Sequence, residues 1–172
     1  MNLAECIRNV PDFPIAGIQF KDVTTLLKDP EAFAASIETF LNQYADQEID
    51  VVVGIESRGF IWGGVLAYEM GAAFVPVRKP GKLPAETVKA EYTLEYGTNA
   101  LEMHRDAIQP GQNVLVLDDL LATGGTAKAT CELVEQLGGE VVGVAFLIEL
   151  TFLNGREQLA GYDVFTLIQM DD

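Results

Sequence analysis

Two adjacent carboxylates, Asp118 and Asp119, stand shortly before a glycine-rich turn in the sequence. Glycines let backbone N–H groups approach an anion closely, hydroxyl groups add donors, and a helix that starts behind such a turn presents its positive end. Carboxylates beside a phosphate cradle suit a ligand that carries both hydroxyl groups and phosphate, such as a phosphorylated ribose. The residues of the turn are Ala122, Thr123, Gly124, Gly125 and Thr126.

These residues need elements that hold them at one place. Residues 114–117 (Val-Leu-Val-Leu) are a run of apolar residues that predicts a strand buried on both faces, and a helical pattern begins at Thr126. In a parallel α/β sheet, ligands bind outside the carboxyl ends of such strands. The sequence matches neither the P-loop nor the dinucleotide-binding fingerprint, which argues against those two classes of nucleotide-binding protein.

The rest of the chain predicts an α/β fold, an open and mostly parallel sheet with helices on both faces. A strand over 50–55, a helix over 60–70 and a strand over 73–77 form a βαβ unit. Asp29 and Pro30 mark the start of an earlier helix, as its N-cap and its first residue. Further elements are expected as a helix over 126–137, strands over 141–150 and 162–170, and a short turn or helix over 154–159.

The 172 residues are expected to form a single domain with two appendages. Residues 1–27 are interpreted as an N-terminal cap. Within it we expect a short helix over 4–9 and an irregular, extended loop over 11–22, because two prolines and a glycine interrupt that stretch. The second appendage is a lid over 78–105.

The lid segment is polar and too long for a simple connection, which indicates a functional role. Residues 92–96 and 100–104 alternate like strands around a turn at 97–99, and this pattern predicts a hairpin. A hairpin arm of this kind is typical of a lid over an active site. A dimerisation arm and a disordered loop are the alternatives.

The charge distribution limits the partners. A formal net charge of −15 repels nucleic acid and anionic membranes, and it would repel a polyanionic substrate unless positive charge gathers locally. It does gather in the lid segment, at Arg78, Lys79, Lys82 and Lys89.

The remaining composition indicates a cytoplasmic protein. Cys6 and Cys131 are too few for a disulfide framework and lack metal-ligand spacing, so we expect reduced thiols. No apolar run approaches the roughly 20 residues of a membrane helix. The first residues have neither a basic start nor an apolar stretch, and no signal peptide is expected.

The run of residues 114–126 resembles the phosphoribosyl-pyrophosphate signature of the type I phosphoribosyltransferases. Further stretches resemble the adenine-specific branch of that family, so that the resemblance covers nearly the whole chain in the right order. They are residues 14–22 (Pro-Ile-Ala-Gly-Ile-Gln-Phe-Lys-Asp), 56–60 (Glu-Ser-Arg-Gly-Phe), 77–84 (Val-Arg-Lys-Pro-Gly-Lys-Leu-Pro) and 92–97 (Tyr-Thr-Leu-Glu-Tyr-Gly). The resemblance implies the reaction of adenine with phosphoribosyl pyrophosphate to AMP and pyrophosphate in purine salvage.

The resemblance also implies roles for individual residues. Asp118 and Asp119 would hold the ribose hydroxyls beside a developing oxocarbenium-like charge, and residues 122–126 would cradle the 5-phosphate. The pyrophosphate would be clamped by Arg78, Lys79 and Lys82. Mg²⁺ is expected as a cofactor bound mainly through the pyrophosphate, without direct protein ligands, and the family implies a homodimer.

The same resemblance places the base under the N-terminal cap. Phe20 would stack on the purine, backbone groups around Gln19 would read its 6-amino edge, and Arg58 would reach the ring from the other side. From the lid, Tyr96 would exclude water and Glu95 would manage a proton at the purine.

Two other functions compete with this interpretation. A transferase of the same class could act on hypoxanthine, guanine, xanthine or orotate, although residues 14–22 and the lid argue against it. A regulatory protein could use the same fold to sense phosphoribosyl pyrophosphate, but it would need a basic surface or an added DNA-binding domain.

Overall fold

The core of the protein is a five-stranded parallel sheet with the strand order β4-β3-β7-β8-β9. The computed structural model describes residues 1–94 and 97–172. After β3, the chain adds β4 on one side of β3 and then β7 on the other side. Open α/β sheets bind their ligands at such a point, where the order of strand addition reverses. The bounds are β3 (Val51–Ile55), β4 (Ala73–Val77), β7 (Asn113–Leu121), β8 (Glu140–Leu150) and β9 (Val164–Met170).

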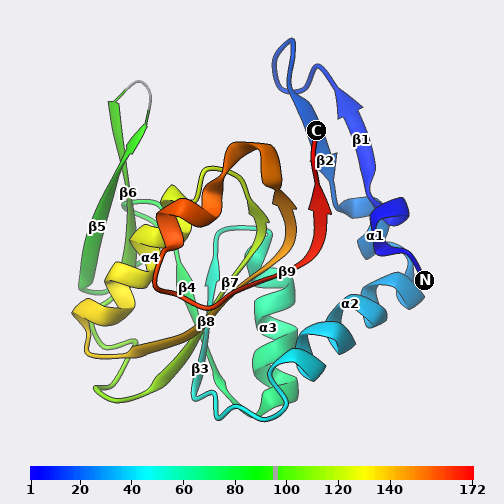
Figure 1. Cartoon of the computed structure of the whole chain (residues 1–172). Helices are drawn as coiled ribbons and strands as arrows, with labels where there is room; N and C mark the ends of the chain where they lie inside the picture. The colour runs from blue at the N-terminus through cyan, green and yellow to red at the C-terminus, as the bar shows by residue number, and fades with distance from the viewer. Residues whose placement is uncertain (95–96) are drawn as a thin grey trace.

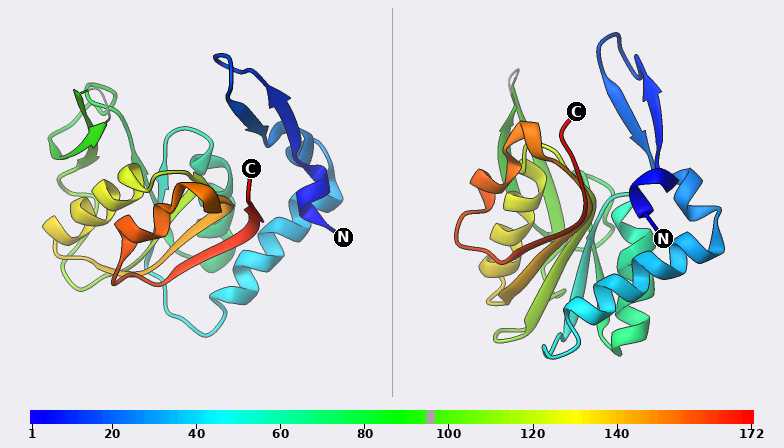
Figure 2. Two further views of the ribbon diagram at one scale, coloured as in Figure 1. Left: turned by 45° about the horizontal axis from the view of Figure 1, so that its top comes forward. Right: turned by 45° about the vertical axis from the view of Figure 1, so that its right-hand side comes forward.

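Helices cover both faces of the sheet, as the right-hand view of Figure 2 shows. One face packs against α2 and α3, where Phe40, Trp62 and Leu66 are buried. The other face packs against α4 and the base of a hairpin. No helix within 1–94 or 97–172 combines the length and apolar character that a membrane crossing requires. The helix bounds are α1 (Thr24–Leu27), α2 (Pro30–Gln43), α3 (Gly59–Met70) and α4 (Gly125–Gln136).

Local sequence explains these elements and confirms the predicted fold class. Every residue of β3 is buried, as expected of a strand covered on both faces. The Asp29 carboxylate accepts hydrogen bonds from the first backbone N–H groups of α2, and Pro30 takes the first helical position. Gly71 ends α3 at φ 65°, a left-handed conformation that glycine adopts without strain.

The N-terminal region differs from the prediction. The helix expected over 4–9 is only a 3-10 turn, η1 (Leu3–Cys6). An antiparallel hairpin follows, in which β1 (Arg8–Pro11) pairs with β2 (Gln19–Asp22), so that strands stand at both ends of the stretch interpreted as an irregular loop. Cross-strand side chains hold this hairpin, because Asn9 Nδ2 donates to Gln19 Oε1 over 2.7 Å and Arg8 Nε donates to Asp22 over 2.9 Å. None of the residues of either strand is fully buried, so the sequence lacks the apolar alternation by which strands are recognised.

The hairpin predicted within residues 78–105 is confirmed as a pair of antiparallel strands, β5 (Thr87–Leu94) and β6 (Gly97–His104). The turn expected at 97–99 is wrong, since these residues belong to β6 and pair with the end of β5. The base of the hairpin packs against the core of the domain. Val88, Leu101 and Met103 are buried in the core against α4, which lengthens the strands beyond the predicted bounds.

Both hairpins rise above the same edge of the sheet. In Figure 1, β1–β2 and β5–β6 stand on opposite sides of the upper edge, toward which β9 points. Because the five strands are parallel, this edge holds the carboxyl ends of all of them. The two appendages therefore flank the edge at which the fold binds ligands.

Candidate active site

The paired carboxylates lie at the carboxyl edge, but β7 continues through them. The prediction ended this strand at residue 117, whereas Asp118 pairs with Phe146 of β8 and the strand extends to Leu121. Both side chains line one cavity at this edge. Asp119 is 5% exposed, and its backbone N–H donates to Asp118 Oδ1 over 2.8 Å.

The Asp118 carboxyl group titrates differently from a free aspartate. Burial of the Asp118 carboxyl group and the neighbouring charge of Asp119 raise the pKa of Asp118 well above its usual range. Asp119 is neutralised by a direct partner instead, since Arg58 Nε donates a hydrogen bond to Asp119 Oδ2.

Arg58 joins the carboxylates to the N-terminal hairpin. Although burial lowers the pKa of Arg58, the charge and hydrogen bonding of Asp119 outweigh burial, and the net shift is upward. Its guanidinium carbon lies 5.6 Å from the centre of the Phe20 ring on β2. The structure thus brings Phe20, Arg58 and Asp119, which lie far apart in the sequence, to one place.

The base of the N-terminal hairpin is also tied to this group. Hydrogen bonds from Thr24 and Arg8 lower the pKa of Asp22 to about 2. The Gln19 side chain accepts a hydrogen bond from Asn9 within the hairpin.

The glycine-rich turn, called the phosphate loop below (residues 122–126), connects β7 to α4. Gly124 takes φ 89° immediately before the helix, a conformation that glycine allows at this junction. A Cβ atom on Gly125 would lie 3.2 Å from the ring of Tyr92 on β5, so the lid hairpin packs directly on the loop. A cavity of about 310 Å³ opens here, lined in part by Tyr92, Thr123, Gly125 and Lys128.

A second cavity, of about 340 Å³, lies beside the carboxylates and is lined by Glu56, Ser57, Arg58, Lys79, Asp118, Asp119 and Leu120. Of the predicted cationic clamp, Lys79 lines this cavity. Arg78 stands next to it and donates to Glu56 over 3.2 Å. Lys82 is exposed and is not among the lining residues.

Glu56 was missed as a site residue by reasoning from the sequence. Its carboxylate accepts hydrogen bonds from Arg78 Nε and, over 2.7 Å, from the backbone N–H of Lys79. A signal was available, because Glu56 directly follows the buried strand β3, just as the aspartate pair directly follows the apolar run of residues 114–117. An acid at the carboxyl end of a second parallel strand belongs to the same edge.

Glu102 on β6 is hydrogen-bonded to the loop that connects β4 to β5 and contains Lys79 and Lys82. It accepts hydrogen bonds from the Gly81 backbone N–H over 2.8 Å and from Thr87 Oγ1 over 2.7 Å. These two bonds lower the pKa of Glu102. The predicted lid residues Glu95 and Tyr96 lie outside the described residues.

The chain is similar to proteins of known class. The family model "Phosphoribosyl transferase domain" matches residues 22–169. An adenine phosphoribosyltransferase from Chloroflexus aurantiacus is 62% identical over 168 residues, which cover 98% of this chain and 97% of the relative.

Solved structures agree with the sequence relatives. The adenine phosphoribosyltransferase of Thermoanaerobacter pseudethanolicus superposes with a TM-score of 0.95 at 54% identity, covering 98% of each chain. The Saccharomyces cerevisiae enzyme, solved with an iminoaltritol bisphosphate and adenine, superposes with a TM-score of 0.90 at 43% identity over 95% of each chain.

Proposed function

This chain belongs to the adenine phosphoribosyltransferase family, and from that premise we propose a division of labour among the residues of its site. The reaction joins adenine to phosphoribosyl pyrophosphate and releases AMP and pyrophosphate, a step of purine salvage. The observation that carries the proposal is the convergence, at one sheet edge, of the aspartate pair, the phosphate loop and the Phe20–Arg58 pair.

The aspartate pair and the phosphate loop bind the phosphoribosyl group. Asp118 and Asp119 accept hydrogen bonds from the ribose hydroxyls and place negative charge beside the oxocarbenium-like carbon. The backbone amides of residues 122–126, with the Thr123 and Thr126 hydroxyls, hold the 5-phosphate at the start of α4. Because this phosphate does not react, its binding energy positions the sugar.

Arg78, Lys79 and Lys82 bind the leaving pyrophosphate. Support comes from Glu56, whose contacts fix Arg78 and the Lys79 backbone at the rim of the second cavity. The carboxylates at this cavity are hard oxygen donors of the kind that Mg²⁺ prefers, so an ion carried mainly by the pyrophosphate oxygens fits there, near Asp118 and Asp119. When bound, Mg²⁺ supplies neutralisation of the charge that develops on the leaving group.

Adenine binds under the N-terminal cap, residues 1–27. Phe20 offers its ring to the purine, Arg58 flanks the same space, and backbone groups near Gln19 select the 6-amino edge. A base with the opposite pattern of donors and acceptors would leave buried groups unpaired, which disfavours hypoxanthine and guanine.

The lid, residues 78–105, closes over the reacting atoms. We assign water exclusion to Tyr96 and proton management at the purine to Glu95. The contact of Tyr92 with Gly125 supports this assignment, because it puts the β5–β6 hairpin directly on the phosphate loop.

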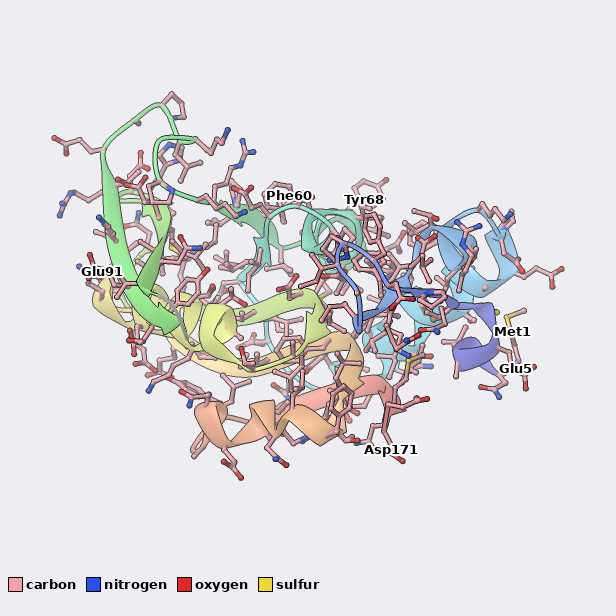
Figure 3. The ribbon with its side chains drawn as sticks, turned by 90° about the horizontal axis from the view of Figure 1, so that it is seen from above. Met1, Glu5, Phe60, Tyr68, Glu91 and Asp171 are labelled. Atoms are coloured by element: carbon pink, nitrogen blue, oxygen red, sulfur yellow. The ribbon has the colours of Figure 1, made fainter. Side chains whose placement is uncertain are left out.

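The enzyme acts as a homodimer in this proposal. Apolar side chains are exposed on α3 and on the neighbouring edge strand β4, namely Ile61, Tyr68 and Phe74. Figure 3 shows Phe60 and Tyr68 along one border of the molecule. A second copy of the chain would cover these groups and the free edge of β4.

A cytoplasmic location completes the proposal. The described cysteines, Cys6 and Cys131, are both free thiols, as is usual in a reducing compartment.

The test of specificity is a panel of bases. Purified protein is mixed with Mg²⁺, phosphoribosyl pyrophosphate and one of adenine, hypoxanthine, guanine, xanthine or orotate, and nucleotide formation is followed. We expect AMP from adenine alone. Turnover of a different base would overturn the roles of Phe20 and Arg58, and binding of phosphoribosyl pyrophosphate without turnover of any base would favour a sensor.

A further inference from the structure

The segment η3 (Gly155–Leu159) packs backbone to backbone against the phosphate loop. A Cβ atom on Gly124 would lie 2.5 Å from the carbonyl oxygen of Gly155, and one on Gly155 would overlap the carbonyl oxygen of Ala122. Figure 1 shows this segment, in orange, beside the upper end of α4. The loop therefore rests on η3, and any displacement of η3 displaces the loop.

What fixes η3 is a buried carboxylate on β8. Glu149 is 4% exposed, and Arg156 of η3 donates two hydrogen bonds to its carboxylate, from Nε over 2.8 Å and from Nη2 over 2.9 Å. Paired bonds of this kind define direction as well as distance. Arg156 Nη1 also donates to the Val164 carbonyl oxygen over 3.2 Å.

Two residues of β9 also hold the Glu149 carboxylate in place. Thr166 Oγ1 and Gln169 Nε2, both on β9, donate to Glu149 Oε2 over 2.9 and 3.3 Å. Burial by itself would raise the pKa of Glu149, but the bonds from Arg156 and Thr166 outweigh burial and lower it. The group stays ionised at neutral pH, and its charge is matched by Arg156.

We propose that Glu149 and Arg156 are positioning residues for the 5-phosphate site, acting through the backbone of Gly155 on the phosphate loop. The pair ties η3 to the two last strands of the sheet and so sets where the loop amides point. Neither residue touches the proposed substrate position. The inference rests on the proposed role of residues 122–126 as the 5-phosphate site.

The test compares binding of two ligands by titration calorimetry, ribose 5-phosphate and pyrophosphate. In Arg156→Gln, loss of the paired hydrogen bonds lets the loop shift, and we expect the Kd of ribose 5-phosphate to rise about 10-fold, since the loop amides no longer align with the phosphate oxygens. The Kd of pyrophosphate, which is bound by the Arg78 side of the site, should change less than about twofold.

Two further variants separate positioning from general destabilisation. Arg156→Lys keeps the charge and one hydrogen bond, so its Kd for ribose 5-phosphate should fall between wild type and Arg156→Gln. Tyr162→Phe is the matched control, because Tyr162 Oη donates to Glu135 at the far end of α4 over 2.6 Å and makes no bond to the loop. It should bind both ligands as wild type does.

The titrations of Arg156→Gln and Thr126→Val each support or overturn a separate part of the proposal. Equal weakening of both ligands in Arg156→Gln, or weakening of neither, would overturn the positioning role, whatever the change in melting temperature. Thr126→Val tests the premise separately. If that variant binds ribose 5-phosphate normally, the 5-phosphate assignment itself is wrong, whereas weakening by Thr126→Val but not by Arg156→Gln removes the positioning role alone.

Discussion

At the scale of single residues, the site combines groups that would destabilise a protein elsewhere. Asp118 has a raised pKa because its carboxyl group is buried beside Asp119. The folded protein therefore keeps a proton that the unfolded chain has already released at the same pH. Stability consequently falls as pH rises from the ordinary aspartate value of 3.8 through the raised value in the fold.

Replacing Asp118 with asparagine should stabilise the protein while damaging catalysis. At pH 7.5 we expect the melting temperature to rise by about 2–4 °C, because the buried charge is gone, and this gain to shrink as pH falls toward 4. The kcat should drop by about 100-fold or more through loss of charge beside the ribose. Thermal unfolding against pH and steady-state kinetics check both parts, with the exposed Asp46→Asn as control. A stability gain that is independent of pH would contradict the assignment.

Phe20 offers a separate test of the adenine position. Phe20→Leu removes the aromatic face, and we expect the KM for adenine to rise about 10-fold, the effect of one lost aromatic contact. The Kd of ribose 5-phosphate should stay unchanged. Phe152→Leu serves as the control, because Phe152 is exposed and belongs to the 3-10 turn after β8, outside the hairpin β1–β2. An unchanged KM for adenine in Phe20→Leu would place the base elsewhere.

At the scale of elements, two hairpins and one short segment surround the carboxyl edge of the sheet. The β5–β6 hairpin is rooted in the core by its base, and Glu102 of that hairpin ties down the loop behind the cationic clamp. The phosphate loop at the start of α4, by contrast, packs against two residues outside it, Tyr92 of β5 and Gly155 of η3. The site is thus assembled from segments that fix one another.

Glu102→Ala should loosen the clamp without touching the sugar site. We expect the KM for phosphoribosyl pyrophosphate to rise about 3- to 10-fold and the Kd of AMP to change less than about twofold, because only the former ligand carries a pyrophosphate. Steady-state kinetics and calorimetry provide the two values. Glu86→Ala, which removes an acid with an 87% exposed side chain from the same segment, should behave as wild type.

The hydrogen bonds that Glu102 accepts from Gly81 and Thr87 weaken in one direction of pH. The pKa of Glu102 is lowered from its usual 4.5, so the support is complete above pH 4.5 and is lost as pH falls through the lowered value. A clamp that weakened already at pH 6 would contradict this role.

At the scale of the whole molecule, a strongly acidic chain binds an anionic substrate. The net charge is −15, yet two of the acids at the site form ion pairs, Asp119 with Arg58 and Glu56 with Arg78. Local pairing therefore prevents the overall charge from excluding the substrate, since exposed charges farther away are screened by salt.

The proposed homodimer is also a property of this scale. Ile61→Glu on α3 should shift the protein from dimer to monomer, because it would bury an unpaired charge in the apolar contact. Sedimentation velocity at micromolar concentration measures the change. Phe152→Glu, which alters an exposed apolar residue outside this face, should leave the mass unchanged. A wild-type protein that sediments as a monomer would refute the proposal.

Much of the architecture could be predicted because its signals are local. Strand β3 and residues 114–117 of β7 are continuous apolar runs, α2 carries its own N-cap in Asp29, and Gly71 ends α3. The N-terminal hairpin could not be predicted, because exposed strands show no apolar alternation and pair through polar side chains such as Asn9.

By itself, the sequence determined the sheet and the position of the aspartate pair and the glycine-rich loop along it, since these depend on residue type and short spacing. Only the tertiary structure decided which distant groups meet. Arg58 reaches Asp119 across 61 positions, Glu56 holds the clamp, and the Glu149–Arg156 pair supports the loop from behind. The physical reason is that ion pairing and backbone packing depend on distance in space, which spacing along a chain does not encode.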